Sequence, residues 1–325
     1  MTEVDLDVHH SESDITEQLR ADVRAGLEAD QKWLSPKWFY DARGSELFEK
    51  ITALPEYYPT RSEREVLAAR GGEIAESSGA HTLVELGSGS SEKTRLLLDA
   101  LTNHGTLKEF VPLDVSETAL AEATEAITAD YPSLEVRGVV GDFTRHLDLL
   151  PSARPRLVVF LGGTIGNFLP ADRAIFLRSV REVLDEGEWL LLGTDLVKDR
   201  ETLERAYDDA AGVTAEFNRN MLHVINNGLG ANFDPAAFDH VSYWDEENEW
   251  IEMRLRAREP LTIDIPGADL RVKFAEGEYV RTEISAKFRR EGIAAELAEA
   301  GFSVEKWWTD SESRFGVSLA RSVRG

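Results

Sequence analysis

The sequence predicts an α/β protein built on a mostly parallel β-sheet, and three observations support this fold class. Short apolar runs alternate with stretches of helical periodicity, which is typical of parallel strands covered by helices on both faces. A Gly-x-Gly turn joins the first run to a helical stretch. After Asp195 the pattern changes to strands with period-two alternation. The apolar runs lie at residues 82–86, 109–114, 134–140, 157–161 and 189–194.

Two helices are predicted before the first strand. Residues 15–27 and 62–77 show helical periodicity, and residues 28–60 between them are mixed, aromatic-rich and interrupted by prolines. A further helix is predicted over 171–183, between the fourth and fifth strands. Residues 1–13 are polar and acidic, and we expect this amino terminus to be loosely ordered.

The segment after Asp195 has a different organisation. Helices are predicted over 200–211 and 215–226, and strand-like pieces follow at 250–256, 270–274 and 279–288. Their alternation indicates a sheet with one solvent-facing side. A helix and two strands then return to the earlier pattern, at 291–300, 302–309 and 314–320.

This organisation predicts two domains. The first comprises 61–196 and 287–325 and carries the parallel sheet, which the last two strands complete. The second combines 28–60 with 197–286, an inserted α+β domain. We expect it to lie over the carboxyl ends of the parallel strands, where ligands bind in open α/β sheets.

Composition limits the classes of function. The 36 basic and 60 acidic residues give a formal charge of −24, which repels phosphate backbones and argues against a nucleic-acid partner. Cysteine is absent, so disulfides and thiolate nucleophiles are excluded, and the seven histidines are too scattered to predict a metal site. Without a secretory signal or an apolar run long enough to span a bilayer, we expect a cytoplasmic protein with no membrane partner.

The glycine turn indicates a nucleoside site. Gly87 and Gly89 follow the first strand, and a helix is predicted to open at Glu92. Such a turn lets a ligand approach bare backbone and its N–H donors. Asp114 ends the second strand, where an acidic residue suits the two hydroxyls of a ribose.

The residue at position 92 helps to choose the cofactor. A dinucleotide fingerprint would place a third glycine there, but the chain has Glu92, whose carboxylate would oppose a pyrophosphate. S-adenosylmethionine has no phosphate and carries a sulfonium cation, so Glu85 and Glu92 are tolerable near it. A nicotinamide dehydrogenase is therefore disfavoured, and S-adenosylmethionine is the predicted cofactor.

A third element of the nucleoside site is Gly141-Asp142-Phe143, after the third strand. The Asp142 carboxylate could accept from the exocyclic amine of adenine while Phe143 covers a face of the ring. The alternative is a helix-capping aspartate next to a core phenylalanine. Taken alone, this segment leaves both readings open.

With these motifs placed, the chain resembles the histidine-specific Nα-methyltransferases of ergothioneine biosynthesis, which have a Rossmann-like class I methyltransferase fold. One matching block is Leu54-Pro55-Glu56-Tyr57-Tyr58-Pro59-Thr60-Arg61. The others lie at 37–41, 193–199, 206–214, 217–220 and 307–310. The resemblance implies three methyl transfers from S-adenosylmethionine to the α-amine of L-histidine, through mono- and dimethylated intermediates, to hercynine. We expect a monomer.

The resemblance also implies a set of cofactor-binding residues. Gly87 and Lys93 would lie against the methionine portion, and Tyr40 would reach the same carboxylate. Asp114 would hold the ribose, and Asp142 with Phe143 the adenine. The alternatives remain that Lys93 is a solvated helix residue and Tyr40 an ordinary buried aromatic.

On the acceptor side, the resemblance assigns the substrate carboxylate to Asn167 and Tyr207, and the imidazole to Tyr57, Glu283 and Ser285. Asn167 follows the small residues of 162–166, which leave room for accumulating methyl groups, but it could also be a turn residue. On a strand Glu283 and Ser285 share one face, either lining a pocket or facing solvent. Met253 could form a wall of the pocket near the imidazole, but a methionine that only fills the core would look the same in the sequence.

The predicted reaction is an in-line displacement in which the protein mainly aligns the reactants. The α-amine must first lose a proton, and Tyr57, Tyr207 or a water chain could provide the route. Two other functions remain: a class I methyltransferase acting on another small amine, and a non-enzymatic cofactor-sensing module. The sensor does not explain a second domain that retains Tyr207, Glu283 and Ser285.

Overall fold

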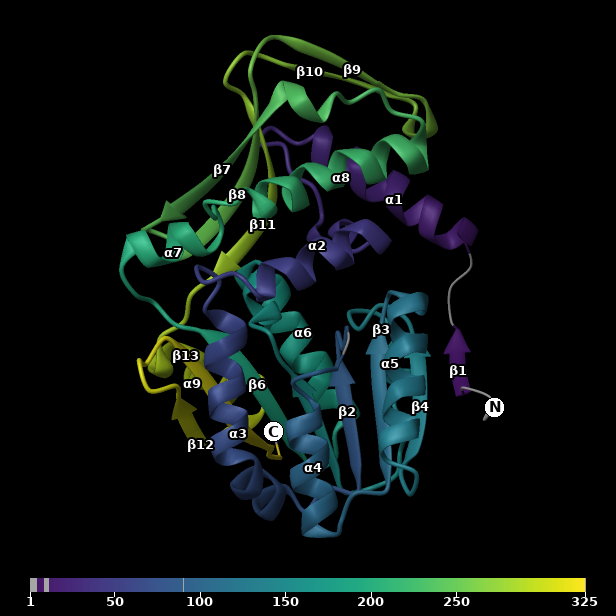
Figure 1. Ribbon diagram of the computed structural model, residues 1–325, viewed down its shortest axis with the longest axis vertical. Coiled ribbons are helices and arrows are strands. Elements are labelled where there is room, and N and C mark those ends of the chain that lie inside the picture. The colour runs from purple at the N-terminus through teal and green to yellow at the C-terminus, as the bar shows by residue number, and fades with distance from the viewer. Residues whose placement is uncertain (1–4, 9–11, 90, 325) are drawn as a thin grey trace. The chain divides into compact units, whose positions relative to one another are not determined.

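The computed structural model describes residues 5–8, 12–89 and 91–324, which form two compact units (Figure 1). The first unit contains strand β1 (Asp5–Val8), Pro59–Val197 and residues 288–324. The second contains residues 12–58 and Lys198–Lys287. Helix α1 (Glu12–Leu27), which the sequence had assigned to neither domain, is part of the second unit.

An eight-stranded sheet forms the centre of the first unit, in the order β1-β4-β3-β2-β5-β6-β13-β12. The neighbouring pairs from β1 to β6 are parallel, and β13 is antiparallel to both β6 and β12. This confirms the predicted α/β fold class with a mostly parallel sheet. The other strands are β2 (Thr82–Leu86), β3 (Glu109–Asp114), β4 (Glu135–Val140), β5 (Arg156–Phe160), β6 (Trp189–Asp195), β12 (Phe302–Thr309) and β13 (Phe315–Ser322).

Strand β2 lies at the point where the strand order reverses. It pairs with β3 on one side and with β5 on the other. The carboxyl end of β2 therefore marks the topological switch point, the place where open α/β sheets bind ligands. The glycine turn that follows β2 lies at this position.

Strand β1 corrects one prediction. We expected residues 1–13 to be loosely ordered, but residues 5–8 pair in parallel with residues 137–140 of β4. An edge strand offers unpaired N–H and C=O groups that a short extended segment can satisfy. Leu6 packs over Gly138, where an added Cβ would lie 2.6 Å from its Cδ2. Residues 1–4 and 9–11 of this segment lie outside the described residues.

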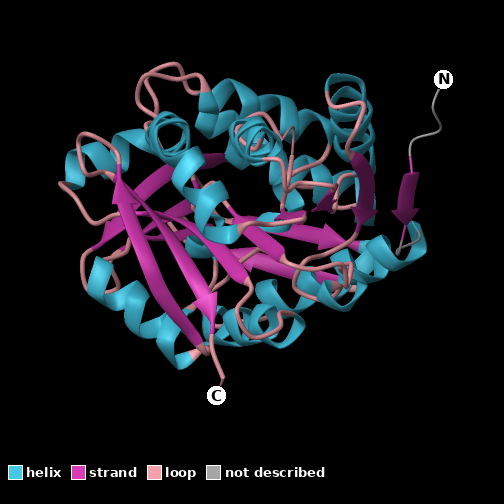
Figure 2. Ribbon diagram, turned by 90° about the horizontal axis from the view of Figure 1, so that it is seen from below, coloured by secondary structure: helices cyan, strands magenta, loops and turns pink. Residues whose placement is uncertain are grey.

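Helices cover both faces of the large sheet (Figure 2). The core of this unit consists of apolar side chains from the strands. Among them are Leu83, Phe110, Leu157 and Leu191, which are fully buried. Burying such apolar surface is the main term that stabilises the unit. The helices are α3 (Pro59–Ser78), α4 (Arg95–His104), α5 (Glu117–Asp130), α6 (Pro170–Val183) and α9 (Arg290–Glu299), with short 3-10 turns η2 (Leu147–Leu149) and η3 (Thr164–Asn167).

The helix after the glycine turn begins later than predicted. Helix α4 starts at Arg95 and not at Glu92, because residues 92–94 form a turn. The hydroxyl of Thr94 is hydrogen-bonded to Glu85, which holds this turn against the end of β2. Glu92 and Lys93 therefore belong to the turn that follows β2 and not to the helix.

The second unit combines helices with two small antiparallel sheets. One sheet has the order β11-β8-β7 and the other pairs β9 with β10. The strands are β7 (Phe238–Asp245), β8 (Trp250–Ala257), β9 (Leu261–Ile265), β10 (Leu270–Phe274) and β11 (Tyr279–Ala286). The other elements are η1 (Pro36–Phe39), α2 (Ala42–Thr52), α7 (Arg200–Ala206), α8 (Val213–Leu229), η4 (Pro235–Ala237) and η5 (Pro266–Ala268).

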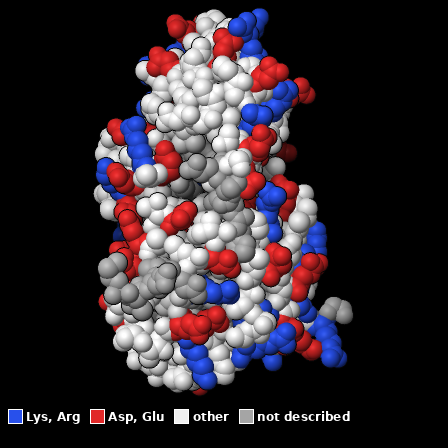
Figure 3. Space-filling model, turned by 90° about the vertical axis from the view of Figure 1, so that its right-hand side faces the viewer, with Lys and Arg blue, Asp and Glu red and all other residues white. Residues whose placement is uncertain are grey.

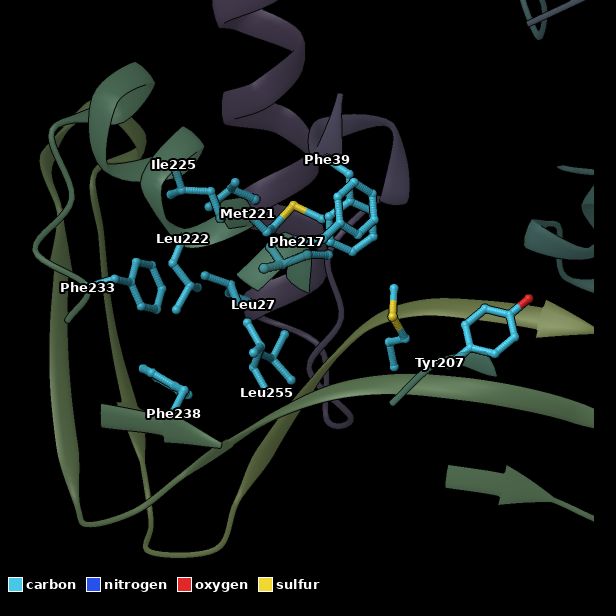
Figure 4. Close-up of a cluster of buried hydrophobic side chains, with 14 of the residues drawn as sticks. Leu27, Phe39, Tyr207, Phe217, Met221, Leu222, Ile225, Phe233, Phe238 and Leu255 are labelled. Carbon is cyan, nitrogen blue, oxygen red and sulfur yellow. The ribbon is translucent and has the colours of Figure 1, made fainter. Parts of the chain in front are cut away.

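The unit is held together by one apolar cluster (Figure 4). Phe217, Met221 and Leu222 of α8 contribute to it from the helix, and Phe238 and Leu255 from the three-stranded sheet. Tyr207 lies at one end of the residues drawn, and its hydroxyl points away from Phe217 and Met221. The cluster therefore orients the Tyr207 ring while leaving its polar end outside the apolar contacts.

Several elements of the second unit differ from the prediction. Helix α7 ends at Ala206 and not near residue 211, and a turn leads to α8, whose first N–H groups, those of Val213 and Thr214, donate to the Asp209 carboxylate. Helix α2, β7 and β9 were not predicted. Strand β7 lacks a regular alternation of buried and exposed side chains, so its sequence carries little strand signal.

The surface shows no segregation of charge on the face seen in Figure 3, where Lys and Arg side chains are interspersed among Asp and Glu. Within the described part of the chain, no helix combines the length and apolar character needed to cross a bilayer.

Candidate functional site

The glycine turn after β2 takes the conformation that requires glycine. Gly87 and Gly89 have φ angles of 69° and 50°, in the left-handed region. The N–H of Gly87 donates to the carbonyl of Leu113 at 2.8 Å, which ties the turn to the end of β3. An added Cβ at Gly89 would meet no atom within 4 Å, so the backbone there is open to a ligand.

Asp114, at the end of β3, is held by backbone donors. Its Oδ2 accepts from the N–H of Gly89 at 2.9 Å, and its Oδ1 from the N–H of Ser116 at 2.9 Å. Burial raises the pKa of this carboxyl, and the backbone N–H groups of Ser116, Gly89 and Val115 oppose that rise. The structure thus brings the predicted ribose-binding carboxylate directly onto the glycine turn.

Glu85 is the buried acid of the turn, with 4% of its surface exposed. It accepts hydrogen bonds from the hydroxyls of Thr94 and Ser91, the latter at 2.8 Å. Burial raises its pKa to about 7, while those hydroxyls and nearby Lys93 act in the opposite direction. Its two hydrogen bonds fix the course of residues 91–94.

Phe143 lies beside the turn. An added Cβ at Gly87 would lie 3.4 Å from the Phe143 ring, which is ordinary van der Waals contact, so the ring lies directly against the turn. The ring also meets Phe160 and Phe176 edge-on, with centroids 5.2 and 5.9 Å apart. Phe143 is therefore both a core aromatic and a neighbour of the predicted nucleoside site.

Asp142 forms a local turn. Its Oδ1 accepts from the backbone N–H of Thr144 at 2.8 Å and from the Thr144 hydroxyl at 2.6 Å. These contacts close a local turn and do not cap a helix, since the next helical element, η2, begins at Leu147, and they account for one carboxylate oxygen. Its predicted contact with adenine stays a prediction.

Lys93 has a partner that sequence reasoning missed. Its ammonium forms an ion pair with Glu63, a residue near the start of α3. Glu63 is fully buried and also accepts from the N–H of Gly162, at 2.8 Å and 3.0 Å to its two oxygens. The sequence does not single out Glu63, because a charged residue in a helix usually faces solvent.

Asn167 lies at the end of the turn η3, which follows β5. Gly162 and Gly163, with φ angles of 77° and 71°, lead into this turn, and the N–H of Gly166 donates to the Gly163 carbonyl at 2.9 Å. The chain therefore presents bare backbone at the carboxyl end of β5, next to the end of β2. The assignment of Asn167 to a substrate carboxylate stays a prediction.

In the second unit the structure brings Tyr57 and Tyr207 together. Their rings meet edge-on with centroids 6.2 Å apart, and both side chains are buried. The hydroxyl of Tyr207 lies 2.7 Å from that of Ser285. Three of the predicted substrate residues therefore form one connected group.

Lys287 completes this group and was not predicted. Its buried ammonium donates to the hydroxyl of Ser285 at 2.8 Å and to that of Tyr207 at 3.0 Å. An ammonium can only donate, so both hydroxyl oxygens act as acceptors toward it. The sequence did contain a signal, because alternation along the strand places 283, 285 and 287 on one face.

Glu283 lies on β11 opposite Met253 of β8. The register shifts between Arg281 and Glu283, so Thr282 forms a bulge. Glu283 is half-buried and Met253 is buried, which places Met253 in the core as well as next to Glu283. The predicted pairing of Glu283 and Ser285 on one face is compatible with the regular register from 283 to 286.

A chain of hydrogen bonds from β11 holds the backbone carbonyl of Tyr207. The hydroxyl of Thr282 donates to the Asn218 side-chain oxygen at 2.6 Å, and the Asn218 amide is 2.9 Å from Nδ1 of His240. Nε2 of His240 is 2.8 Å from the Tyr207 carbonyl. Burial lowers the pKa of His240, and a neutral ring with its proton on Nε2 satisfies each contact.

Tyr40 also lies in the second unit, between η1 and α2. Its ring meets those of Phe48 and Phe217 edge-on, with centroids 5.5 and 5.8 Å apart, and 38% of its surface is exposed. It is therefore a partly exposed member of an aromatic group. Its predicted role toward the cofactor carboxylate remains a prediction.

Comparisons with known proteins identify relatives over nearly the whole chain. Residues 19–322 match the profile of a family described as histidine-specific methyltransferase, SAM-dependent. A histidine N-α-methyltransferase of Mycolicibacterium smegmatis is 57% identical over 94% of this chain and 95% of its own length. One from Mycobacterium tuberculosis is 54% identical over 93% and 94%. Ergothioneine biosynthesis protein 1 of Schizosaccharomyces pombe is 34% identical over 69% of this chain and 30% of its own length.

Proposed function

The chain belongs to the family of histidine-specific, S-adenosylmethionine-dependent methyltransferases, and on this basis we propose that it trimethylates the α-amine of L-histidine. The product is hercynine, formed through mono- and dimethylated histidine as a step of ergothioneine biosynthesis. The observation that carries the proposal is the 57% identity with a histidine N-α-methyltransferase across 94% of the chain.

The residues of the first unit fit S-adenosylmethionine. Gly87 and Gly89 leave the turn without side chains where a ligand would approach, and Asp114 lies on the same turn with a carboxylate that suits ribose hydroxyls. We assign Phe143 and the second oxygen of Asp142 to the adenine, and Lys93 to the carboxylate of the amino-acid end. When bound, the cofactor supplies an activated methyl group and a neutral thioether leaving group.

The residues of the second unit suit the acceptor. The cluster of Tyr207, Ser285 and Lys287 offers a hydroxyl donor beside a positive charge, which favours an anionic group such as a carboxylate. We assign the histidine carboxylate to Tyr207 together with Asn167. Glu283, Ser285 and Tyr57 would receive the imidazole, because a carboxylate can accept its N–H and a hydroxyl can donate to its other nitrogen.

The chain's chemical task is then alignment and removal of a proton. An ammonium has no lone pair, so the α-amine of histidine must be deprotonated before each transfer. Tyr57 and Tyr207 are the candidate catalytic groups for this step, because their rings are in contact and the Tyr207 hydroxyl is already part of a hydrogen-bonded cluster. Positioning the amine accounts for the rest of the rate enhancement.

The test is the mass of the product. The purified protein is incubated with S-adenosylmethionine and each amino acid in turn, and the products are analysed by mass spectrometry. We expect L-histidine to gain three methyl groups, with transient species carrying one and two. Transfer to another small amine in preference to histidine would contradict the proposed substrate while leaving the methyltransferase activity intact.

We also propose that a single chain carries out the reaction. Sedimentation of the active protein should give the mass of a monomer, and activity that appears only in a dimeric fraction would contradict this.

A further inference from the structure

Glu63 is a buried carboxylate at which three segments of the first unit meet. It comes from the first turns of α3, and none of its surface is exposed. Both its oxygens accept from the N–H of Gly162, just after β5, and one also receives the ammonium of Lys93 from the turn after β2. These contacts place Glu63 between the carboxyl ends of the two strands that flank the switch point.

The surrounding residues leave space for this carboxylate. An added Cβ at Gly193, in β6, would lie 2.1 Å from Oε1 of Glu63, which is far inside van der Waals contact. Gly162 has a φ of 77°, a conformation that side chains other than glycine rarely adopt. Two positions thus need glycine for the Glu63 carboxylate to reach Gly162 and Lys93.

Lys93 differs from Glu63 in being accessible. Its side chain keeps 23% of its surface exposed, whereas that of Glu63 keeps none. Within the described parts of the chain, Glu63 is the hydrogen-bond partner of the Lys93 ammonium, which uses one of its three N–H donors. The other two donors can reach a second acceptor without breaking the ion pair.

We propose that Glu63 is a positioning residue that holds the Lys93 ammonium ready for the carboxylate at the amino-acid end of S-adenosylmethionine. The inference rests on the proposed assignment of Lys93 to that carboxylate. A free lysine side chain has four flexible bonds, and ordering it on binding costs conformational entropy. Glu63 fixes the ammonium before the cofactor arrives, so less of that entropy is lost on binding.

A purely structural role for Glu63 makes a different prediction. If Glu63 only supported the end of β5, its loss would disturb the whole nucleoside site. If it positions Lys93, the loss should affect only ligands that carry the amino-acid carboxylate. S-adenosylhomocysteine has that carboxylate, and 5′-methylthioadenosine has the same nucleoside and thioether without it.

The experiment compares these two ligands by isothermal titration calorimetry. We expect Glu63→Gln to bind S-adenosylhomocysteine about 10-fold or more weakly, the range for a misplaced charged hydrogen bond. Binding of 5′-methylthioadenosine should change less than about twofold on the same reasoning. Adding Glu63→Gln to Lys93→Met should cause no further loss for S-adenosylhomocysteine, because Glu63 acts through Lys93. The matched control, Glu76→Gln, makes the same change at an exposed position of α3.

Glu63→Asp keeps the negative charge on a side chain that is shorter by one methylene. This variant serves as the test if Glu63→Gln does not fold. Its loss of affinity should again be confined to S-adenosylhomocysteine. Equal losses for both ligands, no loss for either, or additive losses in the double variant would each overturn the positioning role. These titrations use no methyl acceptor. Failure of the wild-type protein to bind S-adenosylhomocysteine would instead contradict the cofactor assignment itself.

Discussion

Tyr207 shows how one side chain can serve two environments. Its ring lies against Tyr57 within the apolar cluster of the second unit, and its hydroxyl contacts Ser285 and Lys287. Its carbonyl is held separately by His240. The ring is therefore fixed by packing and the backbone by a hydrogen bond, which leaves the hydroxyl as the group that a ligand can use.

Tyr207→Phe should separate these roles. The variant keeps the ring and removes the hydroxyl, so we expect the folded protein and its affinity for S-adenosylhomocysteine to be retained. The KM for histidine should rise about 10-fold, the usual cost of one lost hydrogen bond to a charged group. Steady-state kinetics and calorimetry measure the two effects, and an unchanged kcat/KM for histidine would remove Tyr207 from the substrate site.

Glu85 gives a pH-dependent prediction. Its folded-state pKa of about 7 lies above its ordinary value of 4.5, because burial penalises the charged form. The folded protein therefore holds this proton more tightly than the unfolded chain. The resulting contribution to stability is fully present below about pH 4.5 and is lost as the pH rises through about 7.

Glu85→Gln removes this dependence while keeping an acceptor and a similar shape. We expect the unfolding temperature of Glu85→Gln, relative to that of the wild type, to be higher at pH 8 than at pH 5. The full linkage corresponds to about 3 kcal/mol. Thermal unfolding of the ligand-free proteins at both pH values measures it. A difference between the two proteins that is the same at pH 5 and pH 8 would mean that Glu85 ionises normally.

At the scale of elements, β11 and the residue that follows it carry an acid, a hydroxyl and an ammonium at alternate positions. Glu283, Ser285 and Lys287 follow the alternation of a strand, and the bulge at Thr282 precedes them. Thr282 bonds to Asn218 of α8 and so anchors the bulge. A short strand can therefore present three different hydrogen-bonding groups in a fixed order.

Glu283→Ala should affect substrate selection more than cofactor binding. A site that receives an imidazole N–H loses its acceptor in this variant, and a missing polar partner typically costs about 10² to 10⁴ in discrimination. We expect kcat/KM for histidine to fall at least 100-fold, on the same basis, while the affinity for S-adenosylhomocysteine stays within error. Arg281→Ala changes a residue two positions before Glu283, on the other side of the bulge, and is a control for general damage to β11. Normal histidine kinetics in Glu283→Ala would refute the assignment.

At the scale of the whole molecule, the predicted nucleoside residues of the glycine turn belong to the first unit, and the predicted ring-binding residues belong to the second. Each group is built from segments distant in sequence, such as the turn after β2 with Asp114, and Tyr57 with Tyr207. Binding a ligand to the folded state should stabilise it against unfolding by mass action.

S-adenosylhomocysteine should therefore raise the unfolding temperature, and Asp114→Ala should abolish most of this rise. At a ligand concentration about 100 times the Kd the stabilisation amounts to about 2.7 kcal/mol. Differential scanning calorimetry with and without ligand checks the prediction. Because Asp114 also accepts from Gly89, the ligand-free variant must be measured alongside. A full ligand-induced rise in Asp114→Ala would exclude Asp114 from the cofactor site.

The parallel strands could be predicted closely because their signal is local. The first two strands have the predicted bounds, 82–86 and 109–114, since fully buried strands are continuous apolar runs bounded by polar residues. β1 and β7 could not be predicted in this way. β1 depends on the free edge of β4, and β7 on its partner β8, so their stability comes from pairing and not from their own residue pattern.

The sequence by itself determined the fold class, the glycine turn with Asp114, and the family to which the chain belongs, because these depend on local patterns and on long matching blocks. Only the tertiary structure showed that Glu63 lies against Lys93 and Gly162, and that Lys287 joins Tyr207 and Ser285. The identity of a charged residue in the sequence does not show whether its side chain faces water or a buried partner. Which of the two it meets is decided by the packing of segments that are far apart in the chain.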